Sequence, residues 1–191
     1  MNKSSARLRA KPWARLLTIA AIALLALGLG MVAGHLANLR SPASPEAAAR
    51  LEALVLNSPD GKAIALAQWQ GKIRVVNFWA TWCPPCRQEI PALARIQEKF
   101  AANGVQLVGI ALDSRDSVRE FASQSHTLYP FPYPLLLASP EAIETLTALG
   151  NHQGALPFTV ILDRQGQIRY AGAGSQDEEQ ITHLLAPLIA R

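Results

Sequence analysis

The chain has 191 residues and half of them are hydrophobic, which is enough for one domain with a buried core and a short additional segment. Its formal charge of +4 is unevenly distributed, because five basic and no acidic residues lie within positions 1–15. The other positions carry 13 basic and 14 acidic residues, which excludes an extended nucleic-acid-binding surface.

The amino-terminal region predicts a membrane anchor. Residues 16–34 carry no charge and are long enough, as a helix, to cross a bilayer. We therefore expect a basic cytoplasmic tail at 1–15, a transmembrane helix or uncleaved signal at 16–35, and everything beyond it in the periplasm or another extracytoplasmic space. The alternative is a cleaved signal peptide, since small residues near Ala33 offer a weak cleavage site.

The region after the predicted anchor is rich in small residues and proline. This composition is typical of a linker, so we assign residues 36–50 to a linker that separates the membrane from a folded domain at 51–191.

The first half of that domain predicts strands alternating with helices. Residues 54–56 and 64–66 flank an Asp-Gly turn and predict a hairpin, and 73–79 is an apolar run suited to a buried strand. A helix is expected over 84–102, with Gly104 as its stop, followed by a strand at 105–112 and a helix through about 125.

The second half predicts a helix, a hairpin and a closing helix. The proline-rich stretch 129–134 cannot be helical and leads into the apolar run 135–137, after which Ser139 caps a helix that ends near Gly150. Residues 158–162 and 168–171 predict a second hairpin, and Ser175 with Glu178 fits a capping box. These elements indicate an α/β fold with a central mixed sheet flanked by helices.

The two cysteines of the chain, Cys83 and Cys86, lie at the predicted junction of a buried strand and a helix. A bond between them would close too small a loop to act as a structural crosslink. A helix start favours the thiolate, so Cys83 is the expected nucleophile and Cys86 the thiol that resolves a mixed disulfide. A zinc half-site is the alternative, but the histidines lack the spacing to complete it, and we expect no metal or other cofactor.

The segment VVNFWATWCPPCRQEIP at 75–91 resembles the active site of thioredoxin-fold proteins, and most closely that of the membrane-anchored TlpA/ResA-type thiol-disulfide reductases. The resemblance continues with GALPFT at 154–159 and covers roughly residues 51–191. It implies a thioredoxin-like fold, with Pro157 as a cis-proline and the backbone of Leu156 pairing with an extended substrate strand.

The same resemblance implies that Glu89 handles a proton near Cys86, although a solvated helix charge is the plainer interpretation. Asn77 stands where thioredoxin has a buried Asp, and an amide cannot accept that proton. The Trp82 ring is expected to be exposed beside Cys83 as an apolar platform for substrates, while Trp79 packs in the core.

Both residues between the cysteines, Pro84 and Pro85, lack a backbone N–H, so the Cys83 thiolate should be only moderately stabilised. This favours a reductant. The resemblance implies a protein-disulfide reductase that acts on exported proteins, including apocytochrome c in some members of the resembled family, and that receives electrons from a membrane donor of the DsbD or CcdA kind. We expect a monomer, because nothing in the sequence indicates a large interface. An exported dithiol oxidase and a non-catalytic binding module remain alternatives. A peroxiredoxin is a weaker one, because the expected Pro-x-x-x-Thr segment is absent.

Overall fold

The computed structural model of the chain describes residues 44–124 and 131–190. The predicted tail and anchor at 1–35 lie outside this range. Within the described residues no helix is both long and apolar enough to span a membrane. The compact unit that begins at Pro42 contains all the elements described below.

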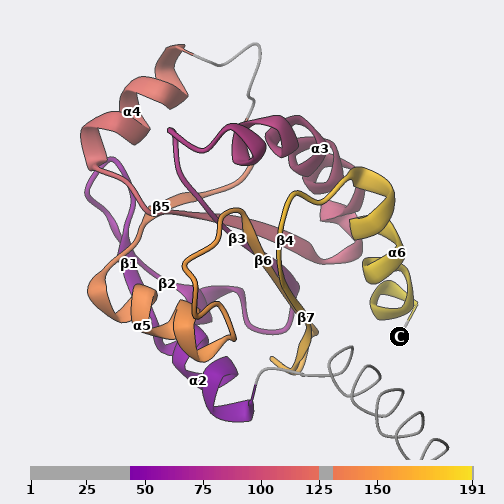
Figure 1. The fold of residues 1–191 in the computed structure, drawn as a ribbon. Coiled ribbons are helices and arrows are strands. Elements are labelled where there is room, and N and C mark those ends of the chain that lie inside the picture. Colours follow the sequence, from indigo (N-terminus) through magenta and orange to yellow (C-terminus); the bar gives the residue numbers. More distant parts are fainter. Residues whose placement is uncertain (1–43, 125–130, 191) are drawn as a thin grey trace, which may run out of the picture. The chain divides into compact units, whose positions relative to one another are not determined.

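Five strands form one mixed sheet in the order β5-β4-β3-β6-β7 (Figure 1). Strands β3, β4 and β5 run parallel to one another, whereas β6 lies antiparallel to β3 and β7 antiparallel to β6. Their bounds are β3 Ile73–Trp79, β4 Val105–Ala111, β5 Leu135–Leu137, β6 Phe158–Leu162 and β7 Ile168–Ala173. The central strand β3 is buried at every position, as its apolar run predicted.

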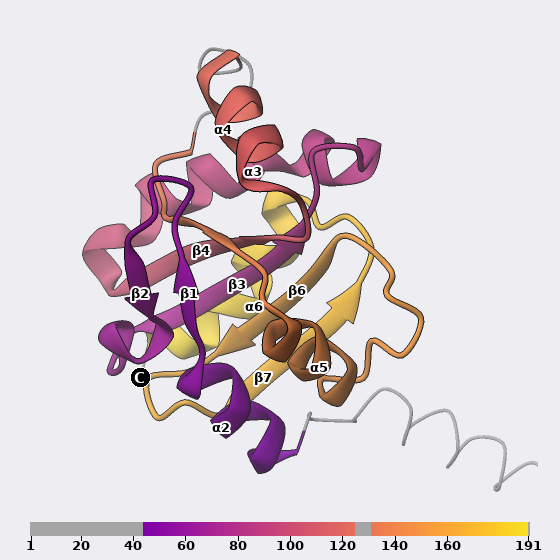
Figure 2. The same cartoon turned by 90° about the vertical axis from the view of Figure 1, so that its left-hand side faces the viewer.

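Helices cover both faces of this sheet (Figure 2). Helices α3 (Pro84–Phe100) and α6 (Glu178–Ile189) pack together on one face, and α2 (Pro45–Ala53) and α5 (Pro140–Ala148) on the other. The short antiparallel pair β1 (Val55–Asn57) and β2 (Ala63–Ala65) lies on the α2 side and is followed by the 3₁₀ turn Leu66–Trp69. Helix α4 (Arg115–Gln124) follows β4. The thioredoxin-like α/β architecture expected from the sequence is present.

The predicted helix ends agree with the structure in two places. After α3 and the 3₁₀ turn Ala101–Asn103, Gly104 adopts a left-handed conformation with φ of 80°, which ends the helical segment. Helix α5 begins at Pro140, and the side chain of Ser139 accepts a hydrogen bond from the Ala142 N–H.

The linker assigned to 36–50 is wrong at its carboxyl end. The Ser44 side chain caps α2, Pro45 occupies the first turn, and Ala47, Ala48 and Leu51 are buried in the core. Small residues and proline can start a helix as readily as they form a linker, so the folded domain begins before residue 51.

The predicted capping box is displaced by two residues. Asp177, rather than Ser175, caps α6, and the side chain of Gln180, rather than Glu178, bonds back to the cap backbone. Ser175 lies before the helix, where the neighbouring Gln176 N–H donates to Glu89 on α3.

Candidate active site

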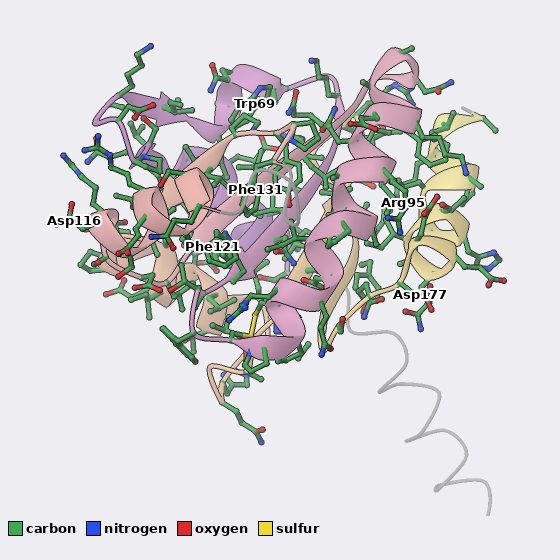
Figure 3. The ribbon with its side chains drawn as sticks, turned by 90° about the horizontal axis from the view of Figure 1, so that it is seen from above. Trp69, Arg95, Asp116, Phe121, Phe131 and Asp177 are labelled. Carbon is green, nitrogen blue, oxygen red and sulfur yellow. A yellow bond between two sulfur atoms is a disulfide. The ribbon has the colours of Figure 1, made fainter. Side chains whose placement is uncertain are left out.

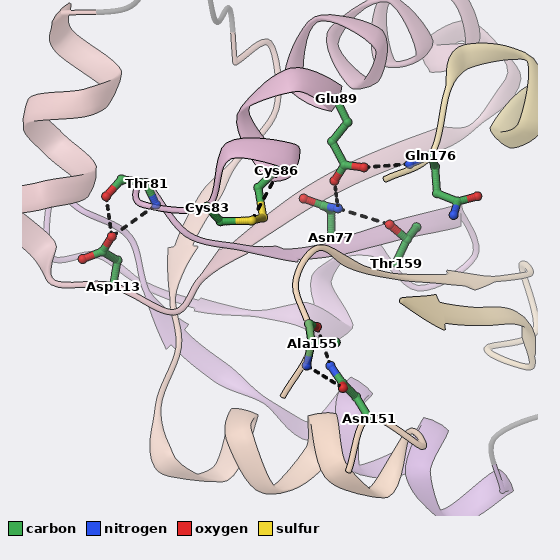
Figure 4. The surroundings of a disulfide bond; sticks show 10 residues. All are labelled: Asn77, Thr81, Cys83, Cys86, Glu89, Asp113, Asn151, Ala155, Thr159 and Gln176. Atoms are coloured by element: carbon green, nitrogen blue, oxygen red, sulfur yellow. Dashed lines mark hydrogen bonds between the residues drawn. A yellow bond between two sulfur atoms is a disulfide. The ribbon is translucent and has the colours of Figure 1, made fainter. Parts of the chain in front are cut away.

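Cys83 and Cys86 lie where the central strand β3 meets helix α3, and they form a disulfide (Figure 4). Cys83 is the N-cap of α3, so its sulfur sits at the positive end of the helix. The Cys83 residue is 4% exposed to solvent, and Cys86 is fully buried. A partner sulfur can therefore approach the pair only from the side of Cys83.

The prolines between the cysteines limit the hydrogen bonds available to the Cys83 sulfur. Pro84 and Pro85 occupy the first two positions of α3 and have no N–H. The first free donor is the Cys86 N–H, whose nitrogen lies 3.3 Å from Cys83 Sγ. The site thus offers one backbone donor to a developing thiolate within the first turn of the helix.

Asp113 holds the loop that precedes Cys83. Its Oδ2 accepts hydrogen bonds from the Thr81 N–H, at 3.2 Å, and from the Thr81 hydroxyl. Burial alone would raise the pKa of Asp113, but the hydrogen bonds from Thr81 and Ser114 outweigh it and hold the pKa below its usual range. The ionised carboxylate therefore ties the end of β4 to the segment between β3 and the disulfide.

Glu89 lies one turn beyond Cys86 on α3 and is buried, with 2% of its surface exposed. Its Oε1 accepts from Asn77 Nδ2 at 2.7 Å and its Oε2 from the Gln176 N–H at 2.9 Å. Burial raises the pKa of Glu89 to about 7, and these hydrogen bonds oppose the rise only partly. The interpretation of Glu89 as a solvated surface charge is wrong.

Asn77 is part of the same buried network. Its amide also donates to Thr159 Oγ1 at 3.1 Å, on the neighbouring strand β6. An amide is neither an acid nor a base near neutral pH, so in this network the group able to accept or give up a proton is Glu89.

Pro157 directly precedes β6, and the Leu156–Pro157 peptide bond is cis, as predicted. The Leu156 side chain packs against the apolar cluster that contains both cysteines. Within the described residues, the Leu156 N–H and C=O have no hydrogen-bond partner. Both groups are therefore available to an incoming strand, and the pairing that the resemblance implies stays a prediction.

The two tryptophans near the disulfide have the environments expected for them. Trp82 is 67% exposed, whereas Trp79 is 2% exposed. Trp79 packs against Phe121 of α4 and against Phe131. The rings of Phe121 and Phe131 also contact each other (Figure 3). Trp82 and the exposed prolines, Pro84 and Pro85, form the apolar surface around Cys83.

Sequence reasoning missed Asp113 and Asn151 as residues of the site. Asp113 could have been found, because residues that follow adjacent parallel strands meet at the same edge of a sheet. Asn151 hydrogen-bonds the backbone of Ala155, two residues before the cis-proline, and no sequence signal marks it. No cluster of three or more potential metal ligands occurs among residues 44–124 and 131–190.

The fold and the cysteine pair define a thioredoxin-like thiol-disulfide oxidoreductase. Residues 47–171 match the AhpC/TSA family profile. The chain is 30% identical over 129 residues to the thiol-disulfide oxidoreductase ResA of Bacillus thuringiensis, an alignment that covers 66% of this chain and 69% of its relative. With these matches, the chain belongs to the AhpC/TSA family and, within it, to the TlpA/ResA-type oxidoreductases.

Two further comparisons extend the likeness over more of the chain. ResA of Halalkalibacterium halodurans is 25% identical over 178 residues, covering 93% of this chain and 94% of the relative. The crystal structure of a secreted thiol-disulfide isomerase from Corynebacterium glutamicum superimposes with a TM-score of 0.63 at 26% identity, covering 74% of this chain and 86% of that one.

Proposed function

We propose that this oxidoreductase works outside the cytoplasm, held at the cytoplasmic membrane by residues 16–35, and that it reduces disulfides in exported proteins. The charge pattern of the first 35 residues supports this location. A solved structure of similar fold is that of a secreted protein, which agrees with it.

The proposed direction of electron flow rests on one observation, the small number of hydrogen-bond donors around the Cys83 sulfur. Any interaction that stabilises the thiolate makes the disulfide a stronger oxidant. Because Pro84 and Pro85 lack N–H groups, the Cys86 N–H is the backbone donor closest to the start of α3 that can reach the Cys83 sulfur. Weak stabilisation of the thiolate favours a reductant.

In the proposed reaction, the Cys83 thiolate attacks a substrate disulfide and releases one substrate thiolate. Cys86 then loses its proton and attacks the Cys83 sulfur, which forms the Cys83–Cys86 bond and releases the second substrate sulfur as a thiolate. Two electrons pass to the substrate, and Glu89 takes the Cys86 proton during the second step. A membrane donor of the DsbD or CcdA kind would restore the two thiols.

Substrates would bind across the apolar surface around Cys83. Trp82 provides an exposed ring there, with Pro84 and Pro85 beside it, and Leu156 next to the cis-proline provides backbone groups for an extended segment. Proteins that expose a disulfide in an unfolded segment, such as apocytochrome c, fit this surface.

The experiment that tests the direction is the reduction potential of the full-length chain, equilibrated with dithiothreitol or glutathione and followed by tryptophan fluorescence. We expect a value near or below that of thioredoxin, about −270 mV. A value near that of DsbA, about −120 mV, would instead establish an exported dithiol oxidase.

A further inference from the structure

The loop that joins α5 to β6 is fixed by one buried side chain. Asn151 is 5% exposed, and its amide makes two hydrogen bonds to the Ala155 backbone (Figure 4). Asn151 Nδ2 donates to the Ala155 carbonyl at 2.8 Å, and the Ala155 N–H donates to Asn151 Oδ1 at 2.9 Å. The amide therefore pairs with residue 155 as a neighbouring strand would.

The backbone of Asn151 is itself anchored to the end of α5. Gly150 has a φ of 99°, and its N–H donates to the Thr147 carbonyl at 3.0 Å. The Asn151 N–H donates to the Leu146 carbonyl at 3.2 Å. These two bonds form a Schellman motif, so the position of Ala155 is set by a helix end and not only by the loop.

The pairing leaves Leu156, next to the cis-proline, available to a substrate. Both backbone groups of Ala155 are engaged by Asn151, and the Pro157 carbonyl accepts from the Gly174 N–H at 2.8 Å. Between them, Leu156 keeps both its N–H and its C=O without a partner in the described part of the chain. Among residues 155–157, Leu156 is therefore the one whose two backbone groups can both pair with an incoming strand.

We propose that Asn151 is a positioning residue for protein substrates. Asn151 fixes where the substrate strand binds. This rests on the proposed function, in which that strand pairs with Leu156. Without the amide, Ala155 would lose both partners and the free groups of Leu156 would no longer be held beside the disulfide. Small disulfides with no peptide backbone would not depend on Asn151.

The test compares two substrates of the full-length chain, insulin and 2-hydroxyethyl disulfide, with KM and kcat measured separately. For Asn151→Ala we expect KM for insulin to rise about tenfold, with kcat for insulin and both constants for 2-hydroxyethyl disulfide within about twofold of wild type. Asn151→Asp keeps an acceptor for the Ala155 N–H but sets a carboxylate oxygen against the Ala155 carbonyl, so its KM for insulin should rise at least as much as that of Asn151→Ala.

Asp163→Ala is the matched control. It removes side-chain hydrogen bonds to the Gln165 and Gln167 N–H groups in the turn at the opposite end of β6, together with the ion pair to Arg169, and it should change KM for neither substrate. An unchanged insulin KM in folded Asn151→Ala, or equal increases for both substrates, would overturn the inference. If Asn151→Ala does not fold, the same criteria apply to Asn151→Asp.

Failure of the proposed function would appear separately, in the wild-type chain. Should that chain oxidise thiols instead of reducing disulfides, the same comparison with reduced insulin chains and 2-mercaptoethanol decides the role of Asn151.

Discussion

The carboxyl group of Glu89 has lost nearly all contact with water but keeps hydrogen bonds from the Asn77 amide, the Gln176 N–H and the Ser175 side chain. These donors do not replace the hydration of a full negative charge, so the neutral form is favoured up to about pH 7. A carboxyl group with this pKa can both lose and gain a proton under working conditions. Glu89 follows Cys86 by one helical turn, which is the position that the proposed proton transfer requires.

We predict that Glu89 makes the oxidised protein less stable as pH rises from 4.5 to 7. The pKa in the folded state lies above its ordinary value, so the folded state binds the proton more tightly and the stabilisation is lost as the pH rises through the folded pKa. The full effect is about 3 kcal/mol in the free energy of unfolding. Urea unfolding of wild type and Glu89→Gln across this range measures it.

Glu89→Gln should remove this slope, whereas Glu98→Gln, which changes an exposed glutamate on the same helix, should retain it. Asp113 and Asp163 have lowered pKa values and contribute a slope of opposite sign, below pH 3.8, outside this range. Equal slopes in wild type and Glu89→Gln would show that Glu89 does not titrate in this way.

At the scale of single residues, the sequence predicts chemistry better than environment. Cys83, Cys86 and Pro157 could be placed because short motifs fix their local geometry. The burial of Glu89 could not, since its partner Gln176 lies 87 residues away in the chain. Asn151 was missed because a single polar residue in a loop carries no periodic signal.

At the scale of elements, α2 shows how composition can mislead. Its alanines and single proline are typical of a linker, yet alanine has the highest helix propensity and proline is favoured in the first helical turn. Ala47, Ala48 and Leu51 are spaced to lie on one helical face, and all three are buried. The helix is stabilised by this packing, which a local sequence pattern of nine residues hardly reveals.

We predict that Leu51→Ala lowers the free energy of unfolding by roughly 2–4 kcal/mol, because it opens a cavity in the core beneath α2. Leu51 is 1% exposed. Ile143→Ala is the control, since Ile143 is 51% exposed on α5 and its loss should cost less than about 1 kcal/mol. Chemical denaturation measures both. Similar small losses in the two variants would mean that α2 is not an integral part of the folded domain.

At the scale of the whole domain, the direction of the strands gathers the site at one edge of the sheet. The parallel strands β3 and β4 end there, at the segments that carry Cys83 and Asp113, and the antiparallel strand β6 begins there after Pro157. The order of strands and helices predicts this arrangement, because crossover connections follow few topologies. The residue-by-residue pairing of the strands and the cap of α6 depend on side-chain contacts between distant parts of the chain, so they were not predictable.

The proposed location outside the cytoplasm can be tested through the two cysteines of the chain. In a Cys86→Ser variant, Cys83 is the lone thiol, and we predict that a membrane-impermeant maleimide labels it in intact spheroplasts. A Cys83→Ser, Cys86→Ser chain that carries Ser4→Cys places the thiol in the predicted cytoplasmic tail, so labelling should require lysis. If Cys83 also reacts only after lysis, the domain is cytoplasmic. If the lone thiol at position 4 reacts without lysis, the predicted orientation is wrong. If the mature chain no longer contains residue 4, the amino-terminal segment is a cleaved signal peptide.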